Sequence, residues 1–334
     1  MFSFFKSNNP ALVVINIILI VLFRFVFLVH GLDIAGLYHH TEPAAAFLIR
    51  LIYPAHMSQL WLAIAGGALC LVESLLVNRI INRHKVSQRK NYLGGILFVI
   101  FTSMIPECTL ISPAQVSLLF LLLVFDQLFD LSRPEKLYAN QFDLGFLSGI
   151  AMLVYFPSVF MLPLVIVGFL TMRTGTLKGI MIIFTGFASV LAIVFTHYLW
   201  YDRLPDMLPD MVNLSNRRAL STVRLTHWQD ISIAWIVMVD AWILANVPGI
   251  LYSSVIQTRK YITILILSGF FSLLAIALLF NFNLTHLIFV LTSLSILSAM
   301  YFVETKMALV AEILFIVLIL SVFTFQYLPI FVPV

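Results

Sequence analysis

Hydrophobic residues occur along the chain in eleven long runs, separated by polar segments. A helix of about 20 apolar residues spans the hydrocarbon core of a bilayer, so each run is interpreted as a membrane-spanning helix, although 92–106, 142–155 and 158–172 are short for a full crossing. The pattern predicts an all-α fold, a polytopic transmembrane helical bundle with about 11 spans. The predicted spans are 11–29, 59–77, 92–106, 114–131, 142–155, 158–172, 178–200, 231–251, 261–280, 284–302 and 307–328.

One interruption decides the number of spans. Tyr155-Phe156-Pro157-Ser158 divides what would otherwise be a single apolar run. Proline removes a backbone donor and clashes with the preceding turn, so we expect a tight hairpin between two helices here. A single kinked helix is the alternative, and it would give ten spans in place of eleven.

Two polar segments are long enough to hold structure outside the membrane. These are 30–58 and 201–230, and with the basic loop 78–91 they complete a single integral membrane domain over 1–334. The first contains an apolar stretch between Pro43 and Pro54, which predicts a short helix lying along the interface. Nothing in the pattern predicts a soluble domain.

Composition supports the membrane interpretation and excludes other classes. The chain is 62% hydrophobic and 10% charged, against about 25% charged residues in soluble domains. The sequence contains no phosphate-binding loop, dinucleotide fingerprint, zinc-protease motif or nucleophile elbow. It therefore carries no motif that indicates one of these soluble enzyme classes. The net charge of +4 is spread over short loops and forms no patch for nucleic acid.

The positions of lysine and arginine predict the orientation. Cytoplasmic loops carry an excess of these residues, and a cytoplasmic N-terminus puts 13 of the 19 in inner loops. We therefore expect a bacterial inner-membrane protein with its N-terminus in the cytoplasm and its C-terminus in the periplasm. The inner set is Lys6, Arg79, Arg83, Lys85, Arg89, Lys90, Arg133, Lys136, Arg173, Lys178, Arg259, Lys260 and Lys306.

A group of acids and histidines follows the first span. Asp33 is a candidate catalytic base or ligand of a divalent metal that neutralises a lipid phosphate. With His39, His40 and Glu42 it is also a candidate zinc site. An ordinary solvated loop is the third interpretation. No motif requires a cofactor, and this group is the candidate for a divalent metal.

The second long outer segment is basic, where positive charge is normally depleted. Arg217, Arg218, Arg224 and His227 lie within it. Guanidinium groups bind phosphate in a two-pronged way, so these residues are candidate ligands for the phosphate of a lipid-linked substrate. Contact with anionic lipid headgroups is the alternative, and membrane lipids are expected partners in either case.

Several charged residues lie inside predicted spans, where charge is costly. Arg24 and Asp240 are at similar depths below the outer face, which predicts a structural ion pair between the first and eighth spans. Glu73, Asp126 and Glu312 are predicted nearer the cytoplasmic ends, where they would meet headgroups, water or basic loops.

Parts of the chain resemble an uncharacterised family of polytopic inner-membrane proteins from Bacteroidota. The resemblance is carried by Phe4-Phe5-Lys6-Ser7-Asn8-Asn9-Pro10, by Gly149-Ile150-Ala151-Met152-Leu153-Val154-Tyr155-Phe156-Pro157-Ser158 with Thr171-Met172-Arg173-Thr174-Gly175-Thr176-Leu177-Lys178, and by Tyr198-Leu199-Trp200-Tyr201-Asp202. It covers about the first two-thirds of the chain.

The wider layout is similar to that of the GT-C glycosyltransferase superfamily, which has long outer loops and an acidic residue soon after the first span. The resemblance implies a protein that handles a polyprenyl-phosphate-linked sugar at the outer face, with Asp33 in the place of that acid. Asp33 has no adjacent second acid and no soluble C-terminal domain follows, so a relative without catalysis fits as well. The alternative function is a non-catalytic transporter or a scaffold component of an envelope assembly.

Overall fold

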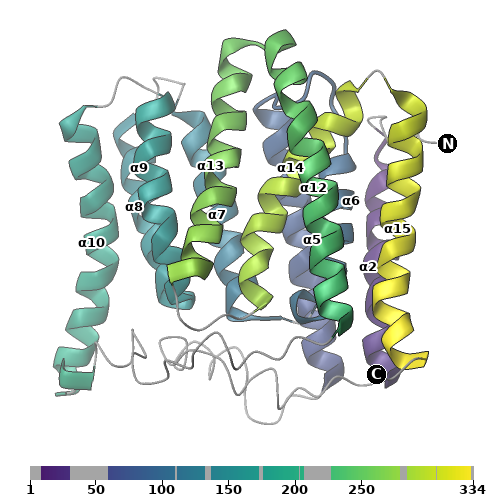
Figure 1. Cartoon of the computed structure of the whole chain (residues 1–334). Coiled ribbons are helices and arrows are strands. Elements are labelled where there is room, and N and C mark those ends of the chain that lie inside the picture. The colour runs from purple at the N-terminus through teal and green to yellow at the C-terminus, as the bar shows by residue number, and fades with distance from the viewer. Residues whose placement is uncertain are drawn as a thin grey trace.

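The computed structural model describes residues 9–30, 59–109, 111–131, 137–172, 176–202, 204–206, 227–278, 284–305 and 307–331. Within these residues the chain forms eleven α-helices and no strand (Figure 1). Each of the eleven predicted spans corresponds to one helix, so the all-α prediction is confirmed. The helices are α2 (Ala11–His30), α5 (Gln59–Arg83), α6 (Leu93–Ser103), α7 (Pro113–Asp130), α8 (Leu137–Val154), α9 (Met161–Met172), α10 (Leu177–Trp200), α12 (His227–Ser253), α13 (Ile256–Leu278), α14 (Leu287–Glu304) and α15 (Ala308–Phe331).

Six helices are long and apolar enough to cross a bilayer by themselves. They identify the chain as an integral membrane protein that crosses the bilayer several times. Shorter apolar helices lie among them, including Leu93–Ser103 and Phe156–Met172. The six are Ala63–Arg83, Pro113–Asp130, Leu177–Trp200, Ile256–Leu278, Leu284–Glu304 and Ala308–Gln326.

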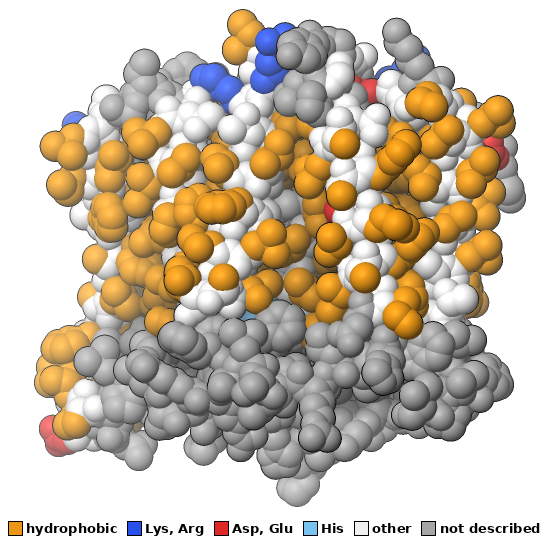
Figure 2. All heavy atoms as spheres, in the orientation of Figure 1, with side chains coloured by type: hydrophobic (Ala, Val, Ile, Leu, Met, Phe, Trp, Pro, Cys, Tyr) orange, Lys and Arg blue, Asp and Glu red, His pale blue; other side chains and the backbone are white. Residues whose placement is uncertain are grey.

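Successive helices run in alternating directions between two ends of the bundle (Figure 1). We call one of them the basic end, because exposed Lys and Arg side chains gather there, while hydrophobic side chains cover the sides (Figure 2). Helices α2 and α10 finish at the opposite end, and α5 and α12 begin there. The basic end is defined by Lys85, Arg89, Lys90 and Arg259.

The interruption at Pro157 is a hairpin. Helix α8 ends at Val154, Tyr155 is extended, and a 3-10 turn with the proline near its start, Phe156–Phe160, leads into α9. Because α8 begins and α9 ends at the basic end, the two helices are antiparallel (Figure 1). The proline, which cannot donate a hydrogen bond, thus ends one helix as predicted, and the single kinked helix is excluded.

Two predicted loop boundaries were wrong. Helix α5 continues to Arg83, so the predicted loop 78–91 loses its first six residues to the helix. Helix α12 begins at His227, which shortens the second outer segment. In both cases charged or polar residues extend the helix beyond the apolar run, because the intrahelical hydrogen bonds do not depend on side-chain hydrophobicity.

The centre of the bundle is formed by α6 and α14. Every residue of α6 is buried, and 89% of the apolar window of α14 is buried, against 22% for α10 and 28% for α15. Helix α10 packs closely on α8: a Cβ added at Gly145 would lie 1.8 Å from the carbonyl oxygen of Ile183, and one at Gly186 would lie 2.2 Å from that of Phe142. Only glycine allows the two backbones to approach in this way.

Candidate functional site

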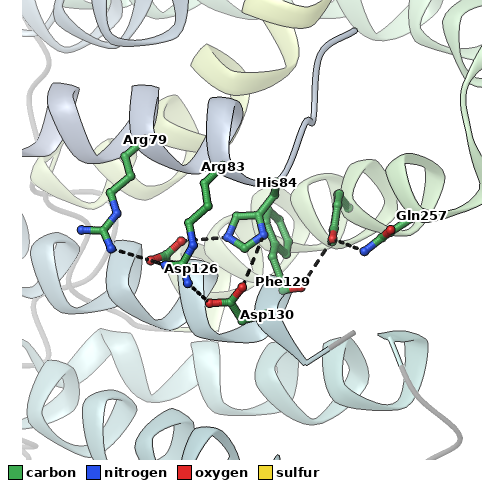
Figure 3. Close-up of polar contacts among 8 residues, drawn as sticks. Arg79, Arg83, His84, Asp126, Phe129, Asp130 and Gln257 are labelled. Carbon is green, nitrogen blue, oxygen red and sulfur yellow. Dashed lines mark hydrogen bonds and ion pairs between the residues drawn. The ribbon is translucent and has the colours of Figure 1, made fainter. Parts of the chain in front are cut away.

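Two arginines and two aspartates meet at the basic end of the bundle. Arg79 and Arg83 are one turn apart on α5, and Asp126 and Asp130 are one turn apart on α7 (Figure 3). Arg83 Nη1 lies 2.6 Å from Asp126 Oδ2, and its Nη2 contacts Asp130 Oδ2. Arg79 Nη2 lies 3.7 Å from Asp126 Oδ2. The four-residue spacing on both helices puts the charges on facing sides, where they balance.

A buried histidine extends this cluster to a third helix. His84 follows α5, is 1% exposed, and donates from Nε2 to Asp126 Oδ1 over 2.8 Å. The rings of Phe129 and Tyr261 make T-shaped contacts with its imidazole ring, at centroid distances of 5.4 and 5.9 Å. Tyr261, on α13, accepts a 2.6 Å hydrogen bond from Gln257. The cluster therefore ties α5, α7 and α13 together, with its two arginines directed to its two aspartates.

A second group of polar residues lies inside the bundle, at the junction of α2, α5 and α7. The side-chain amide of Gln115 donates over 3.2 Å both to Glu73 Oε2 and to the carbonyl oxygen of Gly66. Arg24 Nη2 donates to the same carbonyl over 3.3 Å, and its Nε donates to the carbonyl of Thr109 over 2.8 Å. A continuous chain of polar contacts thus runs from the middle of α5 toward the end of the bundle opposite the basic residues.

The junction extends toward the basic end through a second contact between α2 and α5. Asn16 Nδ2 donates to Ser74 Oγ over 2.7 Å, and Ser74 is the neighbour of Glu73. Four residues of the junction carry buried side-chain atoms without a hydrogen-bond partner: Asn16 Oδ1, Arg24 Nη1, Glu73 Oε1 and Gln115 Oε1. Such atoms are uncommon in native proteins, and each calls for an explanation.

The predicted ion pair between Arg24 and Asp240 is not present in the described structure. The guanidinium group of Arg24 is directed to two backbone carbonyls instead. Asp240 is buried in α12, where its Oδ1 has no hydrogen-bond partner. The prediction rested on similar depth along the spans, but the packing of α2 against α5 decides which partners the arginine reaches.

The other predicted site residues fall mainly outside the described part of the chain. Asp33, His39, His40 and Glu42 do so, as do Arg217, Arg218 and Arg224, and their predicted roles stay predictions. His227 is the first residue of α12. Within the described ranges, no group of three or more His, Cys, Asp and Glu side chains is placed to hold a metal ion.

The sequence indicated one of the two polar groups and misplaced the other. Asp126 was expected near basic residues and is found there. Glu73 was also expected near that end, yet it is fully buried in the middle of α5, because this helix extends to Arg83. The spacing of Gly66, Glu73, Ser74 and Asn78 on α5 was the available signal, since it repeats on one side of a helix.

No protein-family model matches the chain, and comparisons with curated proteins and with solved structures found no similar protein. The family and superfamily resemblances of the sequence therefore stay predictions.

Proposed function

We propose that the chain is an eleven-span protein of a bacterial inner membrane, with its N-terminus in the cytoplasm and its C-terminus in the periplasm. The support is the alternation of eleven helices between two ends (Figure 1) and the gathering of exposed Lys and Arg side chains at one of them (Figure 2). The positive-inside rule assigns that basic end to the cytoplasm. The opposite end then faces the periplasm.

Within this topology, the proposed function is the handling of a polyprenyl-phosphate-linked sugar at the outer face, in the manner of a GT-C-like protein. Asp33 acts as base or as ligand of a divalent metal. Arg217, Arg218, Arg224 and His227 bind the phosphate, for which paired guanidinium groups are suited.

One observation carries this proposal. Helices α2 and α10 both end, and α5 and α12 both begin, at the end opposite the basic residues (Figure 1). Asp33 comes three residues after α2, and Arg224 comes three residues before α12. The two chain segments that hold the acid and the arginines are therefore attached to the same end of the bundle. A substrate held between them would meet arginine at its phosphate and the acid at its reacting carbon.

The topology is tested first, with reporters that are active only in the periplasm. Fusion after Val334 should give activity, and fusion after Lys90 should give none. Activity after Lys90 would reverse the orientation, and an inactive C-terminal fusion would require an even number of spans.

The site is tested by separating binding from turnover in the full-length protein. Asp33→Asn should abolish sugar transfer from a polyprenyl-phosphate-linked donor while binding of the donor stays within about twofold of wild type, because a base acts on the transition state and contributes little to binding of the ground state. Replacing Arg217 and Arg218 together by Ala should weaken binding by at least about tenfold, as expected for two charge-assisted contacts.

Two outcomes would contradict this assignment. Full activity of Asp33→Asn in cells would show that the carboxylate of Asp33 is not needed for the reaction. Equal loss of binding to all anionic vesicles in the arginine variant, with no preference for the polyprenyl phosphate, shows attachment to headgroups only. Arg89→Ala, an exposed basic residue at the other end, is the matched control and should change neither quantity.

A second candidate function, a scaffold within an envelope assembly, is favoured by the position of α10. This helix lies at one edge of the bundle and packs mainly on α8. Only 22% of its apolar window is buried. A scaffold would use this face against partner helices and would not depend on Asp33. Cross-linking from Ile193 on that face should then capture one defined protein from the membrane, whereas lipid-only products would count against the scaffold.

A further inference from the structure

Of the four side-chain atoms without a partner in the polar junction of α2, α5 and α7, three are acceptors and one, Arg24 Nη1, is a donor. Glu73 Oε1, Gln115 Oε1 and Asn16 Oδ1 all lack a partner, and the side chains that carry them are at most 1% exposed. The amide nitrogen of Gln115 donates to Glu73 Oε2 and to Gly66, and that of Asn16 donates to Ser74, so none of these bonds satisfies the three unpartnered oxygens. An additional hydrogen on one of these oxygens would turn an acceptor into a donor and relieve the imbalance.

The charges around Glu73 do not compensate a carboxylate directly. Among the described residues, three ionisable groups interact with Glu73: Arg24 on α2, Cys70 on α5 and Cys108 next to α6. Cys108 also interacts with Glu107. Arg24 forms no ion pair with Glu73 within 4 Å, and its Nε and Nη2 are directed to Thr109 and Gly66 instead. Helix α6 carries no titratable residue, and the acids of α7 lie at the basic end. A buried charge without a direct partner is strongly unfavourable.

We propose that this junction is an internal proton-binding site, in which Glu73 holds an exchangeable proton on Oε1 and internal water molecules connect it with Asn16, Gln115 and Arg24. The proton comes from a hydronium ion of the adjoining aqueous phase. It forms the O–H bond of the neutral carboxyl and leaves a water molecule behind. The proposal is independent of the sugar-handling function, because its residues belong to the helical core and not to the two outer segments.

The contacts also indicate the side from which the proton exchanges. From Glu73 the polar chain runs through Gln115 and the Gly66 carbonyl to Arg24 and Thr109, which is toward the end opposite the basic residues. Arg24 Nη1, the unpartnered donor, lies on this route. A water molecule needs two to four polar partners, and the unpartnered atoms of the junction supply them.

Infrared difference spectroscopy of the full-length protein in lipid nanodiscs tests the proposal. Spectra recorded between about pH 5 and about pH 9, the range in which unperturbed carboxyls are ionised, should contain the carbonyl stretching band of a protonated carboxyl. The band should shift on transfer to heavy water and should be lost in Glu73→Gln. Asp240→Asn, which changes another buried carboxyl, should keep it.

Thermal unfolding of the same variants makes the test complete. Glutamine has the shape and neutrality of the protonated carboxyl, so Glu73→Gln should unfold within about 2 °C of wild type. Superimposable carbonyl spectra of wild type and Glu73→Gln would overturn the proposal. Failure of Glu73→Gln to fold would overturn it as well, because a neutral side chain of the same shape would then not replace Glu73.

Discussion

Asp126 and Asp130 at the basic end each contact an arginine, whereas Glu73, in the middle of α5, contacts a neutral amide. The first two acids lie beside side chains that reach water: Arg79 is 59% exposed and Arg83 34%. Glu73 is fully buried, and the guanidinium nearest to it is occupied by backbone carbonyls. Acidic side chains of α5 and α7 thus have two different surroundings: the aspartates lie beside arginines that reach water, and Glu73 lies beside a neutral amide inside the bundle.

The difference shows where ionised groups are stable in this bundle. Near an end, long basic side chains keep contact with water while they neutralise an acid, so both partners stay charged. In the interior the desolvation of two ions exceeds their attraction unless they meet directly with good geometry. Ion pairs therefore join helices at the basic end, and hydrogen bonds without ion pairs join them at the junction of α2, α5 and α7.

The largest effect is expected from breaking the charge cluster. Asp126→Ala removes the acid shared by Arg79, Arg83 and His84 and leaves one arginine charge uncompensated. Loss of one partner destabilises a buried pair by about 3–5 kcal/mol and an exposed pair by about 1 kcal/mol or less. Because the Arg83 side chain is 34% exposed, we expect a loss of about 3 kcal/mol. The free energy of unfolding, measured in detergent micelles, should fall by this amount.

Asp126→Asn and Arg89→Ala complete this experiment. Asparagine keeps the size of the side chain but not its charge, so its loss of stability should approach that of alanine, in contrast to Glu73→Gln. Arg89 is exposed at the same end, and its removal should change stability by less than about 0.5 kcal/mol. A neutral effect of Asp126→Asn would show that the cluster contributes shape and not charge.

A smaller effect is expected from Arg24 in the interior. Arg24→Ala removes a hydrogen bond of 2.8 Å to Thr109 and a longer one of 3.3 Å to Gly66, and we expect a total loss of about 1.5–3 kcal/mol, the contribution of one good hydrogen bond to a charged group. Because Arg24 does not contact Asp240, combining this change with Asp240→Ala should give additive losses within about 0.5 kcal/mol. Recovery of stability in the double variant would instead support the ion pair between Arg24 and Asp240 that the sequence predicted.

The smallest effect is expected at the neutral contact between Asn16 and Ser74. Hydrogen bonds between membrane helices contribute about 0.6 kcal/mol on average and about 1.7 at most. A double-mutant cycle of Asn16→Ala and Ser74→Ala should therefore give a coupling energy in this range. A coupling as large as that of Asp126 with Arg83 would remove the distinction between the two regions.

Most of the helical architecture could be predicted, because each helix contains an apolar run that is visible along the chain. The Pro157 hairpin was predictable for a local reason, the missing donor of proline. The position of Glu73 was not, since the polar residues after residue 77 concealed that α5 continues to Arg83. The roles predicted for Asp33 and for Arg217, Arg218 and Arg224 concern residues outside the described structure.

The sequence by itself determined that this is a helical membrane protein, how its helices follow one another and which end is basic. These properties depend on local composition and on the order of apolar and charged segments. Only the tertiary structure decided that Arg24 bonds to carbonyls and not to Asp240, that Arg83 bridges two aspartates, and that Glu73 faces Gln115. Partners across helices depend on rotation and depth of packing, which hydrophobic runs do not specify.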